Sequence, residues 1–383
     1  MSSPSNDQAD AHADAPVGAQ SDDQALASAR TQIDSLDKQI QALLAERAQV
    51  ALDVARIKQA QGRTDFYRPE READVLKRVA ERNEGPLEDA VVMRIMREIM
   101  SACLALESPL KVAYLGPEGT YTQAAVYKHF GHAVNALPSV AIDEIFREVE
   151  AGNAQFGVVP VENSTEGVVT HTLDQLVGSP LSICGEVALA VHHHLLSHSG
   201  ELAGVQRVVA HAQALAQCRQ WLDANLPGVV REAVSSNGEA ARRVAGESNA
   251  AAIAARAASD FYDLPILASN IEDEPNNTTR FLVLGKQHVP ATGRDMTSLL
   301  VSIRNSPGML YKLLAPAADA GVDLTRIESR PSRRQAWDYN FFIDIEGHAD
   351  DARVRQVIEA IESQAAMLKI LGAYPRALSA DNS

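Results

Sequence analysis

The stretch FGVVPVENSTEG, residues 156–167, joins a short apolar run to a polar turn. An apolar run of this length, bounded by turn-forming residues, is typical of a buried strand in an α/β sheet. The ends of such strands commonly carry binding and catalytic groups. Asn163, Ser164 and Thr165 are therefore candidates for a site, although the same pattern also fits an ordinary capped loop before a helix.

Strands and helices alternate on both sides of this stretch. Strands are predicted at residues 111–115, 189–194, 205–210 and 281–284, and helices at 124–130, 143–151, 212–225, 237–245 and 251–259. This alternation predicts an α/β domain over residues 109–287. Two more polar turns, GPEGTYT at 116–122 and NTTRF at 277–281, adjoin predicted strands, and the first has neither Walker nor GxGxxG spacing.

The N-terminal third has a different pattern. Residues 26–61 contain no Pro or Gly and predict one helix. Pro69 opens a second helix to about residue 82, and a third runs from about 87 to 107. We therefore expect an all-α three-helix module over residues 26–108, and the length of its first helix indicates an extended bundle or an intertwined dimer. Residues 1–25 carry five Asp and few apolar groups, and predict a disordered acidic tail.

The C-terminal part predicts a third domain. Its expected elements are strands at 298–304, 323–329, 340–346 and 367–371 and helices at 307–320 and 350–363. The order β-α-β-β-α-β is that of an α+β ferredoxin-like domain, here over residues 297–376.

Composition limits the partners. The formal net charge is -15, with 35 Lys+Arg against 50 Asp+Glu, which argues against binding nucleic acid or an anionic membrane. No run of 18 apolar residues predicts a membrane span. Because residues 1–25 lack the basic start and apolar stretch of a secretory signal, we expect a cytoplasmic protein. Cys103, Cys184 and Cys218 form no CxxC and are expected to be reduced thiols without zinc.

One histidine run and one set of cations need separate interpretation. Residues 192–194 are three consecutive histidines, but neighbouring residues of a strand face opposite sides, so no metal site is predicted.

In the first helix, one cation lies in an apolar seam. Arg47 occurs there at steps of seven with the apolar residues Ile33, Ile40 and Val54. Lys58 lies on nearly the same face as Arg47. A cation in this seam needs an anion, which is either an internal partner such as Asp37 or Glu72, or a bound dicarboxylate.

The motifs around these cations resemble the all-helical chorismate mutase family: Ala29-Arg30, Leu36-Asp37, LLAER at 43–47, Ile57-Lys58 and Arg71-Glu72. In that family two three-helix protomers interlock. The resemblance implies that Arg30 serves the partner's site. It also implies that Arg47 and Lys58 hold the carboxylates and ether oxygen of chorismate, with Glu72 on the hydroxyl and Arg71 in support. Rearrangement to prephenate needs no nucleophile or cofactor, because positioned cations hold the dianion and stabilise the charge that grows on the ether oxygen.

Three residues depart from that family's pattern. Arg68 stands where many relatives have Asp, and its contact with substrate survives only if the backbone N–H makes it. Cys103 replaces a common Ser, and Glu107 replaces a common Gln. Because a glutamate donates a hydrogen bond only when protonated, our hypothesis is that Glu107 makes the mutase favour acidic pH. A mutase module without activity is the alternative.

The middle domain resembles prephenate dehydratase in its motifs GPEGTY, PVENS (160–164), His211-Ala212-Gln213, SSNGEAA (235–241) and Thr279-Arg280-Phe281. The family fold has two α/β lobes around a cleft, like a periplasmic binding protein, and its reaction expels CO2 and hydroxide from prephenate to leave phenylpyruvate. The resemblance implies that the Thr279 hydroxyl donates a hydrogen bond to the departing oxygen. Asn163, Ser164 and Thr165 are implied to bind carboxylates, and Arg280 either binds substrate or buttresses its loop.

The C-terminal domain resembles the ACT regulatory domain in NSPGML (305–310) and IESRP (327–331). There L-phenylalanine binds between paired domains, which implies contacts from Gly308, Met309, Leu310, Glu328, Ser329, Arg330 and Pro331. A domain that serves only in dimerisation is the alternative. Pro316 is expected to kink its helix.

Together these motifs predict a bifunctional mutase and dehydratase of phenylalanine biosynthesis. We expect it to be inhibited by L-phenylalanine, to be at least a homodimer through the mutase and ACT domains, and to need no cofactor or metal. A non-catalytic amino-acid sensor is the rival from another class. The Thr279-Arg280 pair and the cations of the first helix argue against it.

Overall fold

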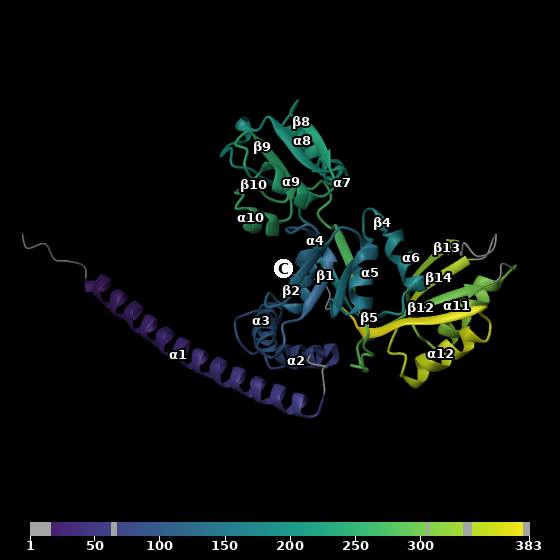
Figure 1. Ribbon diagram of the computed structural model, residues 1–383. Coiled ribbons are helices and arrows are strands. Elements are labelled where there is room, and N and C mark those ends of the chain that lie inside the picture. Colours follow the sequence, from purple (N-terminus) through teal and green to yellow (C-terminus); the bar gives the residue numbers. More distant parts are fainter. Residues whose placement is uncertain (1–16, 63–66, 304–305, 332–338, 378–383) are drawn as a thin grey trace, which may run out of the picture. The chain divides into compact units, whose positions relative to one another are not determined.

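The computed structural model describes residues 17–62, 67–303, 306–331 and 339–377. The chain divides into two compact units between Gln61 and Gly62, and we describe each by itself. The first unit is one helix, α1 (Val17–Ala60), shown in purple in Figure 1. It begins at Val17 and not at Leu26, so the predicted disordered tail is wrong for residues 17–25; residues 1–16 lie outside the described part. Ala and Gln favour helix.

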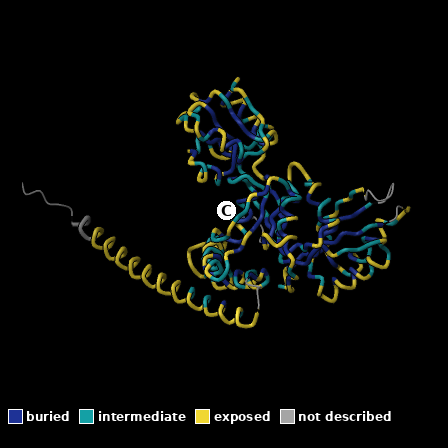
Figure 2. The backbone as a smooth tube through the Cα atoms, in the orientation of Figure 1, coloured by how far each residue is buried: buried dark blue, intermediate teal, exposed yellow. Residues whose placement is uncertain are grey.

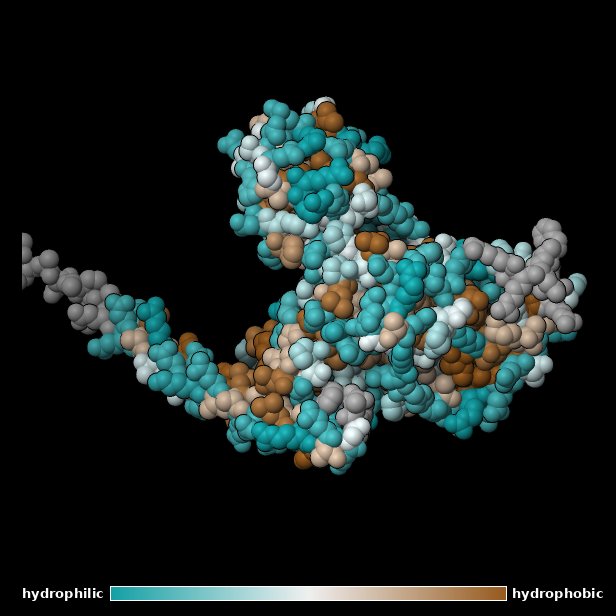
Figure 3. Space-filling model, viewed as in Figure 1, coloured by the Kyte–Doolittle hydropathy of each residue, from teal (hydrophilic) through white to brown (hydrophobic). Residues whose placement is uncertain are grey.

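The apolar side chains of α1 are exposed within its unit. The seam residues Ile33 and Ile40 are 55% and 54% exposed, and Leu43 is 64% exposed. Figure 2 shows most of the helix as exposed, and Figure 3 shows hydrophobic side chains interrupting its hydrophilic surface. A lone helix in water gains little stability from propensity alone, so this seam needs a partner surface.

The second unit begins with a helical hairpin, α2 (Pro69–Glu81) and α3 (Asp89–Glu107). Pro69 occupies the first turn of α2, where its missing N–H is not needed. Leu76 and Val79 are buried. These bounds confirm the predicted second and third helices.

A first α/β lobe follows, with a sheet in the order β2-β1-β3-β11-β5 and β4 paired to β3. Its strands are β1 (Lys111–Leu115), β2 (Asn135–Ser139), β3 (Phe156–Asn163), β4 (Gly167–Val168), β5 (Ser182–Ala190) and β11 (Thr278–Gly285), and its helices are α4 (Tyr121–Phe130), α5 (Ile142–Ala151) and α6 (Thr170–Gly178). Strands β1, β2 and β3 are parallel, whereas β11 runs antiparallel to both β3 and β5.

The second lobe is inserted between β5 and β11. Its sheet order is β10-β6-β9-β7-β8. The strands are β6 (His194–Leu196), β7 (Arg207–His211), β8 (Val230–Val234), β9 (Ala250–Ala254) and β10 (Ile266–Ala268), with helices α7 (Ala212–Gln217), α8 (Arg219–Asn225), α9 (Asn237–Val244), α10 (Arg256–Tyr262) and the short 3-10 turn η1 (Leu202–Gly204). The chain passes between the lobes twice, and the expected two-lobed architecture is confirmed (Figure 1).

Three predicted elements of these lobes were wrong. The helix predicted at 251–259 is strand β9 followed by α10, because the alanine-rich run is the fully buried strand between β6 and β7. Tertiary burial here overrides the helix propensity of alanine. The strand predicted at 189–194 is the end of β5 and the first residue of β6, and the helix at 212–225 breaks at Cys218 into α7 and α8.

The C-terminal domain has an antiparallel sheet in the order β13-β14-β12-β15. Its elements are β12 (Asp295–Ile303), α11 (Met309–Asp319), β13 (Leu324–Pro331), β14 (Tyr339–Glu346), α12 (Ala352–Glu362) and β15 (Met367–Pro375), which confirms the β-α-β-β-α-β order. One face packs under α11 and α12 through Leu313 and Val357. The other face shares a core with the first lobe, where Phe342 and Tyr374 pack with Leu282.

In the described part of the chain, no helix is long and apolar enough to cross a membrane.

Candidate active site

Thr279 and Asn163 face each other on neighbouring strands of the first lobe. Thr279 of β11 is the register partner of Asn163 of β3. The Asn163 Nδ2 donates to Thr279 Oγ1 at 2.8 Å and to Asn277 Oδ1 at 2.7 Å. The bond to Thr279 uses an oxygen lone pair and not the hydroxyl proton. Thr279 can therefore still donate its proton to another oxygen.

The side-chain carbonyl oxygen of Asn163 organises the turn after β3. Its Oδ1 accepts the backbone N–H groups of Thr165 and Glu166, both at 3.0 Å. The Ser164 hydroxyl accepts the N–H of Thr278 at 2.9 Å and so joins this turn to β11. The structure thus brings Asn163, Ser164 and Thr279 together, with Thr165 on the exposed rim.

A chain of polar contacts continues from this turn into the second lobe. Gln217 Oε1 accepts from Asn277 Nδ2 at 3.4 Å and lies 2.7 Å from His193 Nε2. The His193 Nδ1 is 3.0 Å from the Tyr121 hydroxyl. Burial lowers the pKa of His193, so its imidazole is neutral near pH 7. The sequence interpretation missed Gln217 and Asn277. Asn277 belongs to a turn that the sequence had marked, whereas no local pattern distinguished Gln217.

The three consecutive histidines turn to different partners. His192 Nδ1 lies 2.8 Å from Glu272 Oε1, whereas His193 points to Gln217. The ring of His194 accepts from the backbone N–H of Asn270 at 3.3 Å. Among the described residues, no group of three or more His, Cys, Asp or Glu side chains could hold a metal ion.

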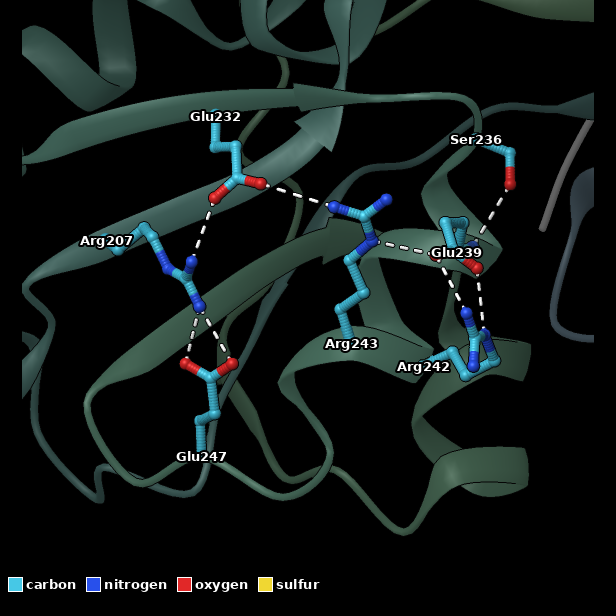
Figure 4. A network of polar contacts seen from close by, with 7 residues as sticks. All are labelled: Arg207, Glu232, Ser236, Glu239, Arg242, Arg243 and Glu247. Carbon is cyan, nitrogen blue, oxygen red and sulfur yellow. Dashed lines mark hydrogen bonds and ion pairs between the residues drawn. The ribbon is translucent and has the colours of Figure 1, made fainter.

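The motifs at 116–122 and 235–241 meet where the two lobes approach each other. A Cβ on Gly238 would lie 2.7 Å from the carbonyl oxygen of Glu118, so only glycine allows this approach. The Ser236 hydroxyl accepts the N–H of Glu239 and caps α9. Figure 4 shows that Glu239 also binds Arg242 and Arg243. These arginines lower the pKa of Glu239 to about 2, so it is no proton donor near pH 7.

Arg280 points away from Thr279. Its Nε binds Glu186 Oε2 at 2.8 Å and its Nη1 binds Asp344 Oδ2, in the C-terminal domain, at 2.7 Å. Adjacent residues of a strand face opposite sides of the sheet, and β11 includes both Thr279 and Arg280. The structure thus places the Arg280 guanidinium on the face of the sheet opposite Thr279, and of its two expected roles the ion pairs favour buttressing of the strand.

The cations of the first helix lie along one continuous element. Arg30, Arg47 and Lys58 all belong to α1. Arg30 and Arg47 are 17 positions apart, which corresponds to about 26 Å at 1.5 Å per residue. One copy of α1 therefore cannot bring both guanidinium groups to the same small molecule. Arg47 is partly exposed within its unit.

Glu72 has a cationic partner that the sequence did not reveal. Arg97 Nε of α3 binds Glu72 Oε1 at 3.1 Å. Burial raises the pKa of Glu72, whereas Arg97 and the Tyr67 hydroxyl lower it. This pair lines a cavity of about 480 Å³, together with Tyr67, His129 and Arg294. No local sequence pattern marked Arg97. It lies 25 positions after Glu72, and only the packing of α3 against α2 brings the two side chains together.

The other predicted residues of the helical module differ in exposure. Arg71 is exposed. Arg68 is also exposed, and its Nε binds Glu70 Oε1 at 2.5 Å. Cys103 is buried in α3, and Glu107 at its end is partly buried.

The two motifs of the C-terminal domain lie at the start of α11 and on the edge strand β13. Gly308 caps α11 with φ 79°, a left-handed conformation that favours glycine. Met309 packs on the domain core and Leu310 is 43% exposed. On β13, Glu328 is partly buried, whereas Ser329 and Pro331 are exposed. The Arg330 guanidinium binds both carboxylate oxygens of Asp174, in α6 of the first lobe, at 3.0 and 3.1 Å.

Comparisons with known proteins agree with this division of the chain. Residues 29–108 match the family model "Chorismate mutase type II", residues 112–289 match "Prephenate dehydratase" and residues 297–363 match "ACT domain". A bifunctional chorismate mutase/prephenate dehydratase of Pseudomonas aeruginosa is 56% identical over 362 residues, 93% of this chain and 99% of the relative. The chain belongs to this bifunctional family.

A second relative and a solved structure extend the comparison. A prephenate dehydratase of Mycobacterium leprae is 39% identical over 287 residues, 71% of this chain and 88% of the relative. The crystal structure of a prephenate dehydratase from Arthrobacter aurescens in complex with L-Phe is 35% identical, with a TM-score of 0.65. It covers 70% of this chain and 90% of that chain.

Proposed function

We propose that this enzyme rearranges chorismate to prephenate and then converts prephenate to phenylpyruvate, with feedback inhibition by L-phenylalanine at the ACT domain. The mutase is assigned to residues 26–108, the dehydratase to 109–287 and the ACT domain to 297–376. The hydrogen bond from Asn163 to Thr279 at the mouth of the first lobe is the observation that carries the dehydratase assignment.

In the dehydratase step, the ring carboxylate of prephenate leaves as CO2 and its bonding electrons enter the ring. The hydroxyl on the opposite ring carbon then leaves with the electrons of its C–O bond. The Thr279 hydroxyl donates to this oxygen and lowers the barrier to its departure. Asn163 orients Thr279 through its Nδ2. Ser164, Thr165 and their turn are assigned to a substrate carboxylate, and aromatisation supplies the driving force.

In the mutase step, Arg47 and Lys58 hold the chorismate carboxylates and ether oxygen, and Glu72 binds the hydroxyl, with support from Arg71. Arg30 is supplied by a second copy of the chain. The span of about 26 Å between Arg30 and Arg47 on α1 supports this assignment, as do the exposed apolar side chains of α1. We therefore propose at least a homodimer, paired through the mutase and ACT domains.

In the ACT domain, L-phenylalanine is assigned to the turn Gly308-Met309-Leu310 and to the strand segment Glu328-Ser329-Arg330-Pro331. The exposure of Leu310, Ser329 and Pro331 supports a ligand or a second ACT domain at this place.

One assay tests the proposed function. Chorismate or prephenate is supplied to the purified chain, and phenylpyruvate is followed with and without L-phenylalanine. We expect both substrates to give phenylpyruvate and the inhibitor to slow its formation. Turnover of prephenate alone would mean an inactive mutase, and turnover of neither would mean a non-catalytic sensor.

The residue at position 107 gives the mutase a testable pH dependence. A glutamate side chain donates to the ether oxygen only when protonated, whereas a glutamine donates at any pH. We therefore expect mutase turnover to fall as pH rises above the acidic range, and Glu107→Gln to flatten that profile. The dehydratase profile of the same variant is the control. An unchanged mutase profile would rule this role out.

A further inference from the structure

The two strands that carry Asn163 and Thr279 present charged side chains on their opposite face. Glu162 precedes Asn163 on β3, and Arg280 follows Thr279 on β11. The register pairs Thr279 with Asn163 and Arg280 with Glu162. Because side chains alternate between the faces of a sheet, one face carries the catalytic pair and the other carries this charged pair.

Arg280 ties β11 to three strands of the ACT domain. Besides its bond to Asp344 of β14, its Nη2 lies 3.1 Å from the Tyr374 hydroxyl of β15. The Ser298 hydroxyl of β12 donates to Asp344 Oδ1 at 2.5 Å. The side chains of Arg280 and Asp344 are only 19% and 8% exposed. This buried cluster holds the back of the catalytic strand against the regulatory domain.

Glu162 makes the corresponding contact for β3. Its Oε2 binds Arg326 Nε of β13 at 3.1 Å. Arg326 shares β13 with the predicted phenylalanine-contacting segment 328–331, and Arg330 of that segment binds Asp174 of the first lobe. Both arginines of this edge strand therefore reach the catalytic lobe.

The surroundings of these ion pairs leave little room for independent movement. Phe342 and Leu371 of the ACT domain and Leu282 of β11 belong to one buried cluster. The cavity between them measures only about 10 Å³. Close-packed interiors transmit displacement and do not absorb it.

We propose that the ion pairs Arg280–Asp344 and Glu162–Arg326 transmit the state of the ACT domain to Thr279 and Asn163. Arg280 and Glu162 are positioning residues: each holds the strand on which a catalytic side chain lies, without touching substrate. A ligand that displaces β13 and β14 shifts β3 and β11 with them and misaligns the hydroxyl donor, and small misalignments cost large factors in rate. This inference rests on the proposed inhibition by L-phenylalanine at the ACT domain.

Two full-length variants and one control test the coupling. Arg326→Gln removes the pair with Glu162, and Asp344→Asn removes the pair with Arg280; both replaced side chains are largely buried, at 13% and 8% exposure. Asp344→Asn leaves Arg280 paired one-to-one with Glu186, so the remaining charges balance. The control is Arg207→Gln, which breaks a comparable cluster with Glu232 and Glu247 in the second lobe (Figure 4). Mutase activity of each variant reports that the chain is folded.

The measurements are kcat and KM for prephenate, the activity that remains at saturating L-phenylalanine, and calorimetric binding of L-phenylalanine. We expect Arg326→Gln to bind the inhibitor yet to keep about tenfold more residual activity than the wild type at saturation. Asp344→Asn should lower kcat about tenfold with KM little changed. The reciprocal exchange of Glu162→Arg with Arg326→Glu should restore inhibition.

Other results would overturn the proposal. If Arg326→Gln is as fully inhibited as the wild type, or if Asp344→Asn has the kinetics of Arg207→Gln, these pairs transmit nothing. A wild-type enzyme that converts prephenate but ignores L-phenylalanine would overturn both the coupling and the proposed regulation. A wild-type enzyme that is inhibited, with variants that behave like it, would overturn the coupling alone.

Discussion

Thr279 accepts a hydrogen bond from Asn163, so its own hydroxyl proton remains available, and we propose that it donates to the leaving oxygen of prephenate. The change Thr279→Val keeps the shape of the side chain and removes this donor. We expect the dehydratase kcat to fall by about 10²–10⁴, with the mutase unchanged, as measured by phenylpyruvate formation from prephenate and by chorismate consumption.

The control is Thr279→Ser, which keeps the hydroxyl and should retain most of the activity. Loss of both activities in Thr279→Val would show that the substitution unfolds the chain. Full activity in Thr279→Val would contradict the assigned role.

His129 gives the second unit a distinct acid sensitivity. Its Nε2 lies 3.2 Å from the Tyr67 hydroxyl, and burial, helped by Arg97, lowers its pKa to about 3. An unfolded histidine titrates near 6.5. At a pH between these two pKa values, the histidine carries a proton in the unfolded state that it lacks in the folded state. The free energy of unfolding therefore falls as pH falls through this window, by ~1.4 kcal/mol per pH unit from this group.

The variant His129→Gln removes this titration. Between about pH 6 and pH 4, we expect its free energy of unfolding in urea to fall less steeply than that of the wild type. His288→Gln, which replaces an exposed histidine, is the control for losing a histidine as such. Parallel curves for wild type and His129→Gln would contradict the prediction.

Single residues could be predicted where they belong to a recognisable local motif. Asn163 and Thr279 came from motifs, and the structure places them side by side. Arg280 was given two possible roles because its motif was interpreted as a turn; once β11 is known to begin at Thr278, strand alternation decides for the rear face. Arg97 and Gln217 had no local pattern, because their partners are set by tertiary packing.

Among the described elements, α1 forms a unit by itself, and its apolar seam is exposed there. Its seam residue Ile40 is 54% exposed. If the seam packs against a second copy, Ile40→Glu places an unpaired charge in an apolar interface. We expect the dimer dissociation constant to rise at least about a hundredfold, equivalent to about 3 kcal/mol, with loss of mutase activity. Sedimentation velocity measures the first effect.

Ala42→Glu is the matched control for this prediction, because it adds the same charge on the opposite side of α1. It should alter neither assembly nor mutase activity. An Ile40→Glu protein that sediments like the wild type would exclude the seam as an interface.

Periodicity identified most elements, and its failure at β9 has a clear physical cause. The run of alanines in β9 has high helix propensity, yet all five residues are buried in the middle of a sheet. Alanine has little preference that could resist such burial, so its conformation is decided by neighbouring strands. Local propensity could not show that environment, whereas Gly and Pro located the hairpin helices well.

At the scale of the whole molecule, the sequence separated the modules but not the surfaces that join them. The ferredoxin-like order predicted helices on one face of the ACT sheet. The second face shares a core with the first lobe. In β14 every residue from Asn340 to Ile345 is buried, so both faces of this strand are covered. Because Asn340 and Asp344 interrupt its apolar residues, the sequence of β14 did not predict this cover. The ion pairs of Arg280 and Glu162 sit within that shared core.

The division of the chain at Gln61 predicts that the two activities can be separated. The fragment 62–383 keeps Thr279, Asn163 and the ACT domain, but it loses Arg30, Arg47 and Lys58. We expect it to convert prephenate with a kcat within about threefold of the full chain and to remain inhibited by L-phenylalanine, because additivity holds between distant sites. It should not consume chorismate.

Full-length Arg47→Ala distinguishes the loss of a cation from the loss of the helix. It should also fail to consume chorismate, but it keeps α1 and its seam. A fragment that loses dehydratase activity while Arg47→Ala retains it would mean that α1 supports the second unit through assembly. Equal dehydratase activity in both would show that α1 contributes to the mutase alone, because the dehydratase core and its regulatory domain then need nothing from the first unit.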